Sequence, residues 1–307
     1  MAMWQEWLLS PVSLALLGLV IGSFLNVVIH RLPRMMQRQW WAEVAGQLQD
    51  EESHHQVFGK PLPGPAQAVG QAIEEGVHTL PALNLATPRS HCPACGHVIG
   101  WSENVPLLSW LRLRGRCAAC GTRIPARYPV VELLTGALFA AMAWRFGSQP
   151  VTLMWCAVAA CLVALSAIDW DTTLLPDSLT QPLAWAGLVA ALCGWSGLPV
   201  ATALTGAVVG YLALWSVYWL FKLVTGKEGM GHGDFKLLAA LGAWLGWQAI
   251  LPIVLMASVL GACVGLGMKA TGRLREGRYV PFGPFLAGGG LVLMLAGTDR
   301  ALAVMGW

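Results

Sequence analysis

The sequence predicts an all-α polytopic membrane protein, with about eight transmembrane helices and a small cytoplasmic zinc-binding domain between the first two. Composition is the first indication, because 56% of the 307 residues are hydrophobic and only 11% are charged. Apolar stretches of membrane-spanning length recur along the chain, and four cysteines form two CxxC pairs. A soluble domain carries about 25% charged residues, so this composition excludes an ordinary soluble protein.

Apolar stretches follow one another through most of the chain. A membrane-spanning helix needs about 20 mostly apolar residues. By this rule we expect spans at residues 8–30, 128–147, 150–168, 179–198, 201–224, 235–247, 250–269 and 281–298. The sixth is short, and Gly246 and Pro252 mark its break from the seventh. The first is expected to remain as a helix, because no basic segment of a signal peptide precedes it.

A large polar region, residues 31–127, separates the first two spans. It holds ten of the nineteen Lys and Arg residues, whereas the first ten residues hold none. The positive-inside rule places this region in the cytoplasm and both termini in the periplasm. Residues 42–90 contain little that could pack a core, so we expect a flexible insert there. The predicted organisation is a first transmembrane helix (1–30), a cytoplasmic domain (31–127) and a membrane-embedded domain (128–307).

The two cysteine pairs lie in the polar region. CPAC contains Cys92 and Cys95, and CAAC contains Cys117 and Cys120. Four thiolates at this spacing suit tetrahedral zinc, and a site with four protein ligands is closed and structural. Two disulfides are the alternative, but a reducing cytoplasm disfavours them.

Two aspartates are expected where a span meets the cytoplasmic face. Asp169 ends the third span and Asp234 precedes the sixth, and ionisable groups at such positions are candidates for function. Two neighbouring carboxylates share a proton. In peptide hydrolysis the ionised member takes a proton from water and the protonated member polarises the carbonyl. Helix capping is an alternative for Asp234, and it suits Asp177 better than a catalytic role does.

Several blocks of sequence, in a fixed order, resemble the bacterial type IV prepilin peptidases, which are bifunctional leader peptidase/N-methyltransferases. The blocks are GSFLNVVIHRLP (22–33), the CPAC and CAAC pairs, YPVVELLTGALF (128–139), IDWDTTLLPDSLT (168–180), GKEGMGHGDFKLLAALGAW (226–244) and VPFGPFLAGG (280–289). The similarity covers nearly the whole chain apart from residues 42–90.

The resemblance implies an intramembrane aspartic protease of the GxGD type, with Asp169 and Asp234 as its catalytic dyad. It implies type IV prepilins or type II secretion pseudopilins as substrates, cut after a glycine that ends a short basic leader. It also implies methylation of the new N-terminal residue with S-adenosylmethionine, an activity associated with the zinc domain and with the glycine that Gly115 matches. The implied location is the bacterial inner membrane, and no nucleic-acid partner is expected.

The S-adenosylmethionine site has no Rossmann-type GxGxxG loop to mark it. The candidate region is the cytoplasmic domain together with Asn26, Arg31 and Glu132 at the membrane edge. Each of these three has a structural alternative: an interhelical hydrogen bond for Asn26, a topology anchor for Arg31 and an ion pair for Glu132.

Two other classes of protein stay open on the residues alone. One is a proton-coupled membrane transporter with a zinc-stabilised cytoplasmic domain. A transporter usually carries its acids near the bilayer midplane and often has internal repeats, and this sequence shows neither. The other is a non-catalytic assembly protein of a secretion machine, in which the zinc domain docks a partner and both aspartates tolerate mutation.

Overall fold

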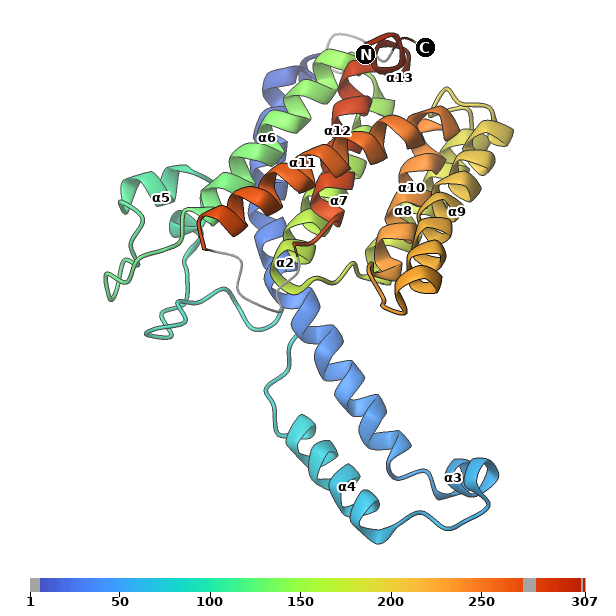
Figure 1. Cartoon of the computed structure of the whole chain (residues 1–307). Coiled ribbons are helices and arrows are strands. Elements are labelled where there is room, and N and C mark those ends of the chain that lie inside the picture. The colour runs from blue at the N-terminus through green and yellow to red at the C-terminus, as the bar shows by residue number, and fades with distance from the viewer. Residues whose placement is uncertain (1–5, 273–279, 305, 307) are drawn as a thin grey trace. The chain divides into compact units, whose positions relative to one another are not determined.

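The structure is a computed structural model that describes residues 6–272, 280–304 and 306 (Figure 1). The extreme ends of the chain, which we predict to be periplasmic, fall partly outside this range, at residues 1–5, 305 and 307. The helices are α2 (Pro11–Gln47), α3 (Glu51–Phe58), α4 (Gly64–His78), α5 (Leu108–Arg112), α6 (Arg127–Phe146), α7 (Pro150–Thr172), α8 (Asp177–Leu192), α9 (Val200–Thr225), α10 (His232–Leu245), α11 (Ile250–Ala270), α12 (Gly283–Ala296) and α13 (Thr298–Val304).

The all-α fold class is confirmed. Within the described ranges, extended pairing is limited to two isolated bridges, His91 with Val98 and Arg116 with Arg123. In the part of the chain that the structure describes, five helical segments are long and apolar enough to cross a membrane: α2, α6, α7, α9 and Trp247–Ala270, which contains α11. The other three predicted spans correspond to α8, α10 and α12, which are shorter than the roughly 20 residues that a bilayer requires. A total of eight spans therefore stays a prediction.

The first helix is longer than its apolar stretch. We expected it to end near residue 30, but α2 continues through Pro33 to Gln47. The stretch after Arg31 is rich in Arg, Met, Gln, Ala and Glu, which are good helix formers even when they are polar. The length rule measures the part that fits a bilayer, whereas the helix itself ends where the helix-forming residues end.

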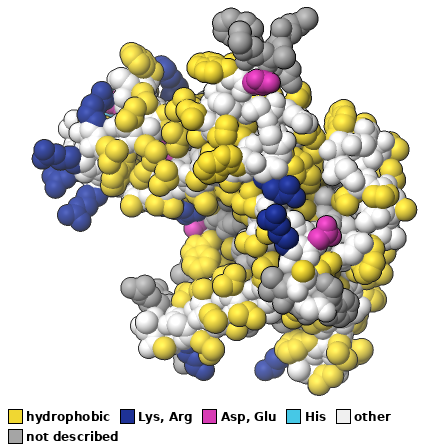
Figure 2. Space-filling view, turned by 90° about the horizontal axis from the view of Figure 1, so that it is seen from above, with side chains coloured by type: hydrophobic (Ala, Val, Ile, Leu, Met, Phe, Trp, Pro, Cys, Tyr) yellow, Lys and Arg dark blue, Asp and Glu magenta, His cyan; other side chains and the backbone are white. Residues whose placement is uncertain are grey.

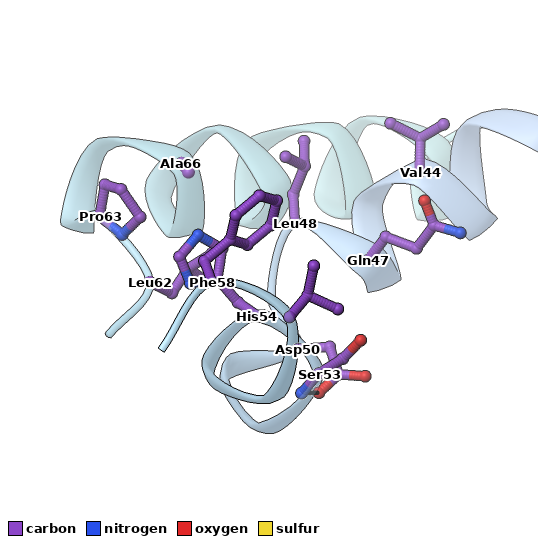
Figure 3. A pocket seen from close by; sticks show the side chains of 11 residues that line it. Val44, Gln47, Leu48, Asp50, Ser53, His54, Phe58, Leu62, Pro63 and Ala66 are labelled. Atoms are coloured by element: carbon purple, nitrogen blue, oxygen red, sulfur yellow. Dashed lines mark hydrogen bonds between the residues drawn. The ribbon is translucent and has the colours of Figure 1, made fainter. Parts of the chain in front are cut away.

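The chain forms two compact units, Val27–Trp101 and the remainder, Met1–Asn26 with Ser102–Trp307. In the Val27–Trp101 unit, Gly70 of α4 lies against Ala45 and Leu48 at the end of α2. A pocket of about 500 Å³ lies between α2, α3 and α4, and Phe58 and Leu48 are among the side chains that line it (Figure 3). The range 42–90 thus contains α3 and α4, and its flexibility stays a prediction.

In the larger unit, α10 is the central helix. Phe235, Leu237, Leu238 and Leu241 are fully buried, where α10 packs against α8, α9 and α12 (Figure 1). The outer helices instead expose apolar side chains, as lipid contact requires, and Figure 2 shows hydrophobic side chains over much of the face seen from above.

Glycines allow α9 and α10 to approach closely. A Cβ on Gly206 of α9 would overlap the backbone carbonyl of Gly242 on α10, and a Cβ on Gly210 would lie 2.6 Å from the carbonyl oxygen of Leu238. Small residues at helix interfaces are characteristic of membrane proteins. The hydrophobic effect does not drive helices together within lipid, so their association depends on close van der Waals packing.

One end of this unit gathers the end of α7 and the beginnings of α6, α8, α10 and α12 (Figure 1). Polar contacts join these ends: Arg127 of α6 pairs with Asp171 of α7, and Asp177 of α8 pairs with Lys236 of α10. The backbone of Gly283, at the start of α12, bonds to Asp169 of α7. Residues that are far apart in the sequence therefore meet at a single end of the helical bundle.

Candidate functional site

Asp169 and Asp234 are the two buried acids at this end of the bundle. Asp169 lies in the last turn of α7 and is 4% exposed, while Asp234 lies in the first turn of α10 and is 8% exposed. Helix α7 stops shortly after Asp169, because Thr173 adopts a left-handed conformation with φ 55° and its N–H returns to the carbonyl of Asp169 at 2.8 Å. Burying a carboxylate costs free energy unless it is paired. A buried acid at the end of an apolar helix is therefore a candidate for function.

The structure brings these two predicted residues together. The side chain of Leu175 connects their surroundings, since it lies against Gly233, which precedes Asp234, and against Gly283, which contacts Asp169. The two buried carboxylates therefore lie in one region at the end of an apolar bundle, around a shared leucine side chain.

Gly283 is the direct partner of Asp169, and the sequence did not identify it. Its backbone N–H donates a 3.0 Å hydrogen bond to Oδ2 of Asp169. Gly283 is the first residue of α12, so the carboxylate also faces the positive end of that helix, where negative charge is stabilised. The available signal was a glycine between Pro281 and Pro284 ahead of an apolar run, but that pattern also fits a simple turn.

Helix capping does not explain Asp234. Helix α10 begins at His232 after Gly231, and no side chain caps it. The Asp234 carboxylate has no hydrogen-bond partner within the part of the chain that the structure describes. Among the described residues, Asp234 is thus a buried acid without a capping role and without a cationic partner.

The other two acids of the same loop have structural partners. Asp171 forms an ion pair with Arg127, at 2.5 Å, and Asp177 accepts from Lys236 through both carboxylate oxygens, each at 2.7 Å. Asp177 does not cap α8 by a side-chain bond, contrary to our expectation. These pairs hold the segment between α7 and α8 to its neighbouring helices.

The four predicted zinc ligands form one cluster. The Sγ atoms of Cys92, Cys95, Cys117 and Cys120 all lie within 4.8 Å of one another. A tetrahedral zinc ion with Zn–S bonds of about 2.3 Å separates its sulfur ligands by roughly 3.8 Å, so a slight contraction of this cluster suits the ion. The donor chemistry therefore fits zinc.

Both cysteine pairs are folded as matching turns. The amide of Gly96 donates to the carbonyl of Cys92 at 2.9 Å, and the amide of Gly121 donates to the carbonyl of Cys117 at 3.0 Å. Both glycines have φ 71°, a region that residues with a Cβ rarely adopt. The glycine after each pair therefore allows the turn that points two sulfur atoms to one side.

Gly115 lies just before the second pair and also requires glycine. Its φ is 65°, and a Cβ there would be 2.8 Å from the ring of Trp110 in α5. The indole N–H of Trp110 in turn donates to the carbonyl of Ile124 at 3.3 Å. Gly115 is thus part of a packed corner around α5, and its conformation alone does not identify a bound cofactor.

The three candidates at the membrane edge have structural contacts. The amide of Asn26 donates to the carbonyls of Gly22 and Tyr128, at 3.2 and 3.1 Å. Glu132 accepts from the backbone N–H of Leu107 at 2.8 Å. Arg31 is separate, because it donates to the carbonyls of residues 84, 85 and 88 within its own unit. The interhelical hydrogen bond expected for Asn26 is therefore present, while a role of Arg31 as a topology anchor stays a prediction. Among the described residues, the partner of Glu132 is a backbone N–H, and no ion pair is seen.

Comparisons with known proteins agree with the resemblance. Residues 16–146 match the family model described as Bacterial Peptidase A24 N-terminal domain, and residues 156–266 match the Type IV leader peptidase family. No solved structure matches the chain.

Three relatives are each named Prepilin leader peptidase/N-methyltransferase. The one from Burkholderia pseudomallei (strain 1026b) is 49% identical over 94% of this chain and 86% of its own length. The one from Aeromonas hydrophila is 48% identical over 92% and 90% of the two chains, and the one from Pseudomonas putida is 45% identical over 97% and 96%. None of these matches supports a transporter. The chain therefore belongs to the type IV leader peptidase family, alongside these prepilin leader peptidase/N-methyltransferases.

Proposed function

We propose that this protein cleaves the leader peptide of type IV prepilins or pseudopilins and then methylates the new N-terminal residue with S-adenosylmethionine. The observation that carries the peptidase is the pair of buried neighbouring carboxylates, Asp169 and Asp234, at one end of an apolar bundle. The names of the relatives and the matching family models support both activities.

The two aspartates have different surroundings, which suggests different roles. Asp169 accepts from the N–H of Gly283 at the positive end of α12, so negative charge on it is stabilised. We assign it as the base that takes a proton from the attacking water. Asp234, held protonated, polarises the scissile carbonyl and stabilises the tetrahedral intermediate. The proton on Asp169 then passes to the leaving amine, so that the C–N bond breaks and the pair returns to its starting state.

The cysteine cluster is assigned to a structural zinc ion. Cys92, Cys95, Cys117 and Cys120 would occupy all four positions of a tetrahedral ion, so no open position remains for a reactive water. Metal binding of this kind contributes folding free energy. S-adenosylmethionine would supply the methyl group, and Gly115 would act by keeping the corner around Trp110 closed.

We further propose that the protein acts in the bacterial inner membrane, in contact with the lipid bilayer. The cysteine cluster and both aspartates would face the cytoplasm, with both termini in the periplasm, because the polar region 31–127 is rich in Lys and Arg. A substrate that spans the membrane once, with a basic leader in the cytoplasm, would then present its scissile bond at the level of the aspartates.

The test is a cleavage assay on the full-length protein in liposomes, with a purified prepilin as substrate. We expect Asp169→Asn and Asp234→Asn each to lower the cleavage rate by about 100-fold or more, while methylation of a pre-cleaved pilin continues. Asp177→Asn is the matched control, because that acid lies at the same end but is paired with Lys236. If either dyad variant cleaves at the wild-type rate, the catalytic assignment is wrong.

A further inference from the structure

Leu175 lies between the two glycines that border the aspartates. A Cβ placed on Gly233 would be 2.8 Å from Cβ of Leu175, and a Cβ placed on Gly283 would be 3.1 Å from its Cδ1. Contacts below 3.0 Å essentially never occur for real Cβ atoms, and contacts near 3.1 Å are tight. One leucine side chain therefore fills the space that side chains at both glycine positions would need.

Each of these two glycines lies next to one of the two carboxylates. Gly233 is the residue before Asp234, and Gly283 donates its N–H to Asp169. The side chain of Leu175 is consequently adjacent to the immediate surroundings of both members of the pair. It is half-buried, so part of it remains accessible from outside the bundle.

The fold fixes the position of this leucine. The segment between α7 and α8 begins at Thr173 in the left-handed conformation and ends at the buried residue Pro176. An ion pair holds each side of it, Arg127 with Asp171 before it and Lys236 with Asp177 after it. Leu175 is therefore positioned beside the aspartates on a short segment that is paired to neighbouring helices on both sides.

We propose that Leu175 is a specificity-determining residue, which limits the side chain on the amino side of the scissile bond to the smallest sizes. This inference rests on the proposed peptidase function. The scissile carbonyl must come within hydrogen-bonding distance of both carboxylates, and the residue that carries this carbonyl then lies against Leu175. A glycine there would fit beside the leucine, whereas a larger side chain would meet the leucine methyl groups.

Removal of the leucine side chain should relax this limit. The experiment compares prepilins with glycine, alanine or valine on the amino side of the scissile bond, cleaved by full-length wild type and by Leu175→Ala in liposomes. We expect Leu175→Ala to raise the ratio of kcat/KM for alanine over glycine by at least about 10-fold, as for one methyl group in a fitted pocket. The controls are Leu175→Met, which keeps the volume, and Leu174→Ala, which trims an exposed neighbour in the same segment; both should keep the wild-type ratio.

The outcomes separate this inference from the proposed function. If wild type cleaves the glycine substrate and Leu175→Ala does so with an unchanged alanine-to-glycine ratio, Leu175 does not set specificity, although the peptidase stands. If wild type cleaves none of the prepilins, the proposed function itself fails. Should Leu175→Ala be inactive on every substrate, Leu175→Val decides, because it removes only one methylene: a raised ratio supports the role and an unchanged ratio overturns it.

Discussion

The backbone N–H of Gly283 donates a 3.0 Å hydrogen bond to Oδ2 of Asp169, and this contact joins the start of α12 to the end of α7. The contact leaves no room for a side chain, because a Cβ on Gly283 would lie 2.5 Å from that oxygen. The orientation of the carboxylate thus depends on a residue from a different and distant part of the sequence, and on that residue having no side chain.

Gly283→Ala should therefore reduce prepilin cleavage by roughly 100-fold, because a misplacement of about 1 Å at a reacting group has an effect of this size. The measurement is the single-turnover cleavage rate, with methylation of a pre-cleaved pilin followed in parallel and expected to persist. Gly288→Ala is the matched control in the same helix, since a Cβ there meets nothing within 4 Å. Equal cleavage rates for the two variants would show that cleavage does not depend on the absence of a side chain at position 283.

The helices were largely predictable because an apolar stretch of bilayer length leaves few alternatives to a helix. The α7 and α9 helices begin and end within a few residues of the predicted spans. The exception is α2, whose polar second half follows helix propensity and contributes nothing to an apolar count. The two helices α3 and α4 were missed for the same reason, since they are short helices in a polar region, which a count of long apolar stretches does not detect.

The site was predictable only where its residues carry distinctive chemistry. Asp169 and Asp234 stand out as acids beside apolar runs, and the spacing of the four cysteines indicates their common cluster. Gly283 and Leu175 have no polar side chain, and their importance comes entirely from what they contact. Contacts of that kind arise from the packing of α7, α10 and α12, which a single sequence does not specify.

The close approach of α9 and α10 gives a prediction about stability. Gly206→Ala should destabilise the protein by about 1–3 kcal/mol, because its Cβ would overlap the backbone of Gly242 and force two helices apart. Thermal unfolding in detergent measures this as a lowered Tm. Gly267→Ala in α11, where a Cβ meets nothing within 4 Å, should leave the Tm near that of wild type. A Tm for Gly206→Ala that matches this control would contradict the packing described.

Zinc content tests the cysteine cluster. The purified protein should hold about one zinc ion per chain, and Cys117→Ser should lower this to background, because a closed site needs all four ligands. Methylation should fall with the zinc, while prepilin cleavage continues. Cys263→Ser, at an exposed position on α11, should keep both zinc and methylation. If the cysteines were instead joined as disulfides, the wild-type protein would contain no zinc and would resist alkylation until reduced.

The bond between Glu132 and Leu107 gives the last prediction, which concerns the start of α5. The N–H of Leu107 donates to the buried Glu132 carboxylate at 2.8 Å, and Leu107 has φ 59°, an unusual value for a leucine. Glu132→Ala removes the acceptor, leaves this N–H without its partner and should cost about 1–3 kcal/mol in stability. Because α5 also packs Trp110 against Gly115, methylation should fall more than cleavage.

Glu132→Gln keeps an acceptor oxygen and should stay near wild type in Tm and in both activities. Equal damage from the alanine and glutamine variants would mean that the charge of Glu132, and not its hydrogen bond to Leu107, is what the protein needs.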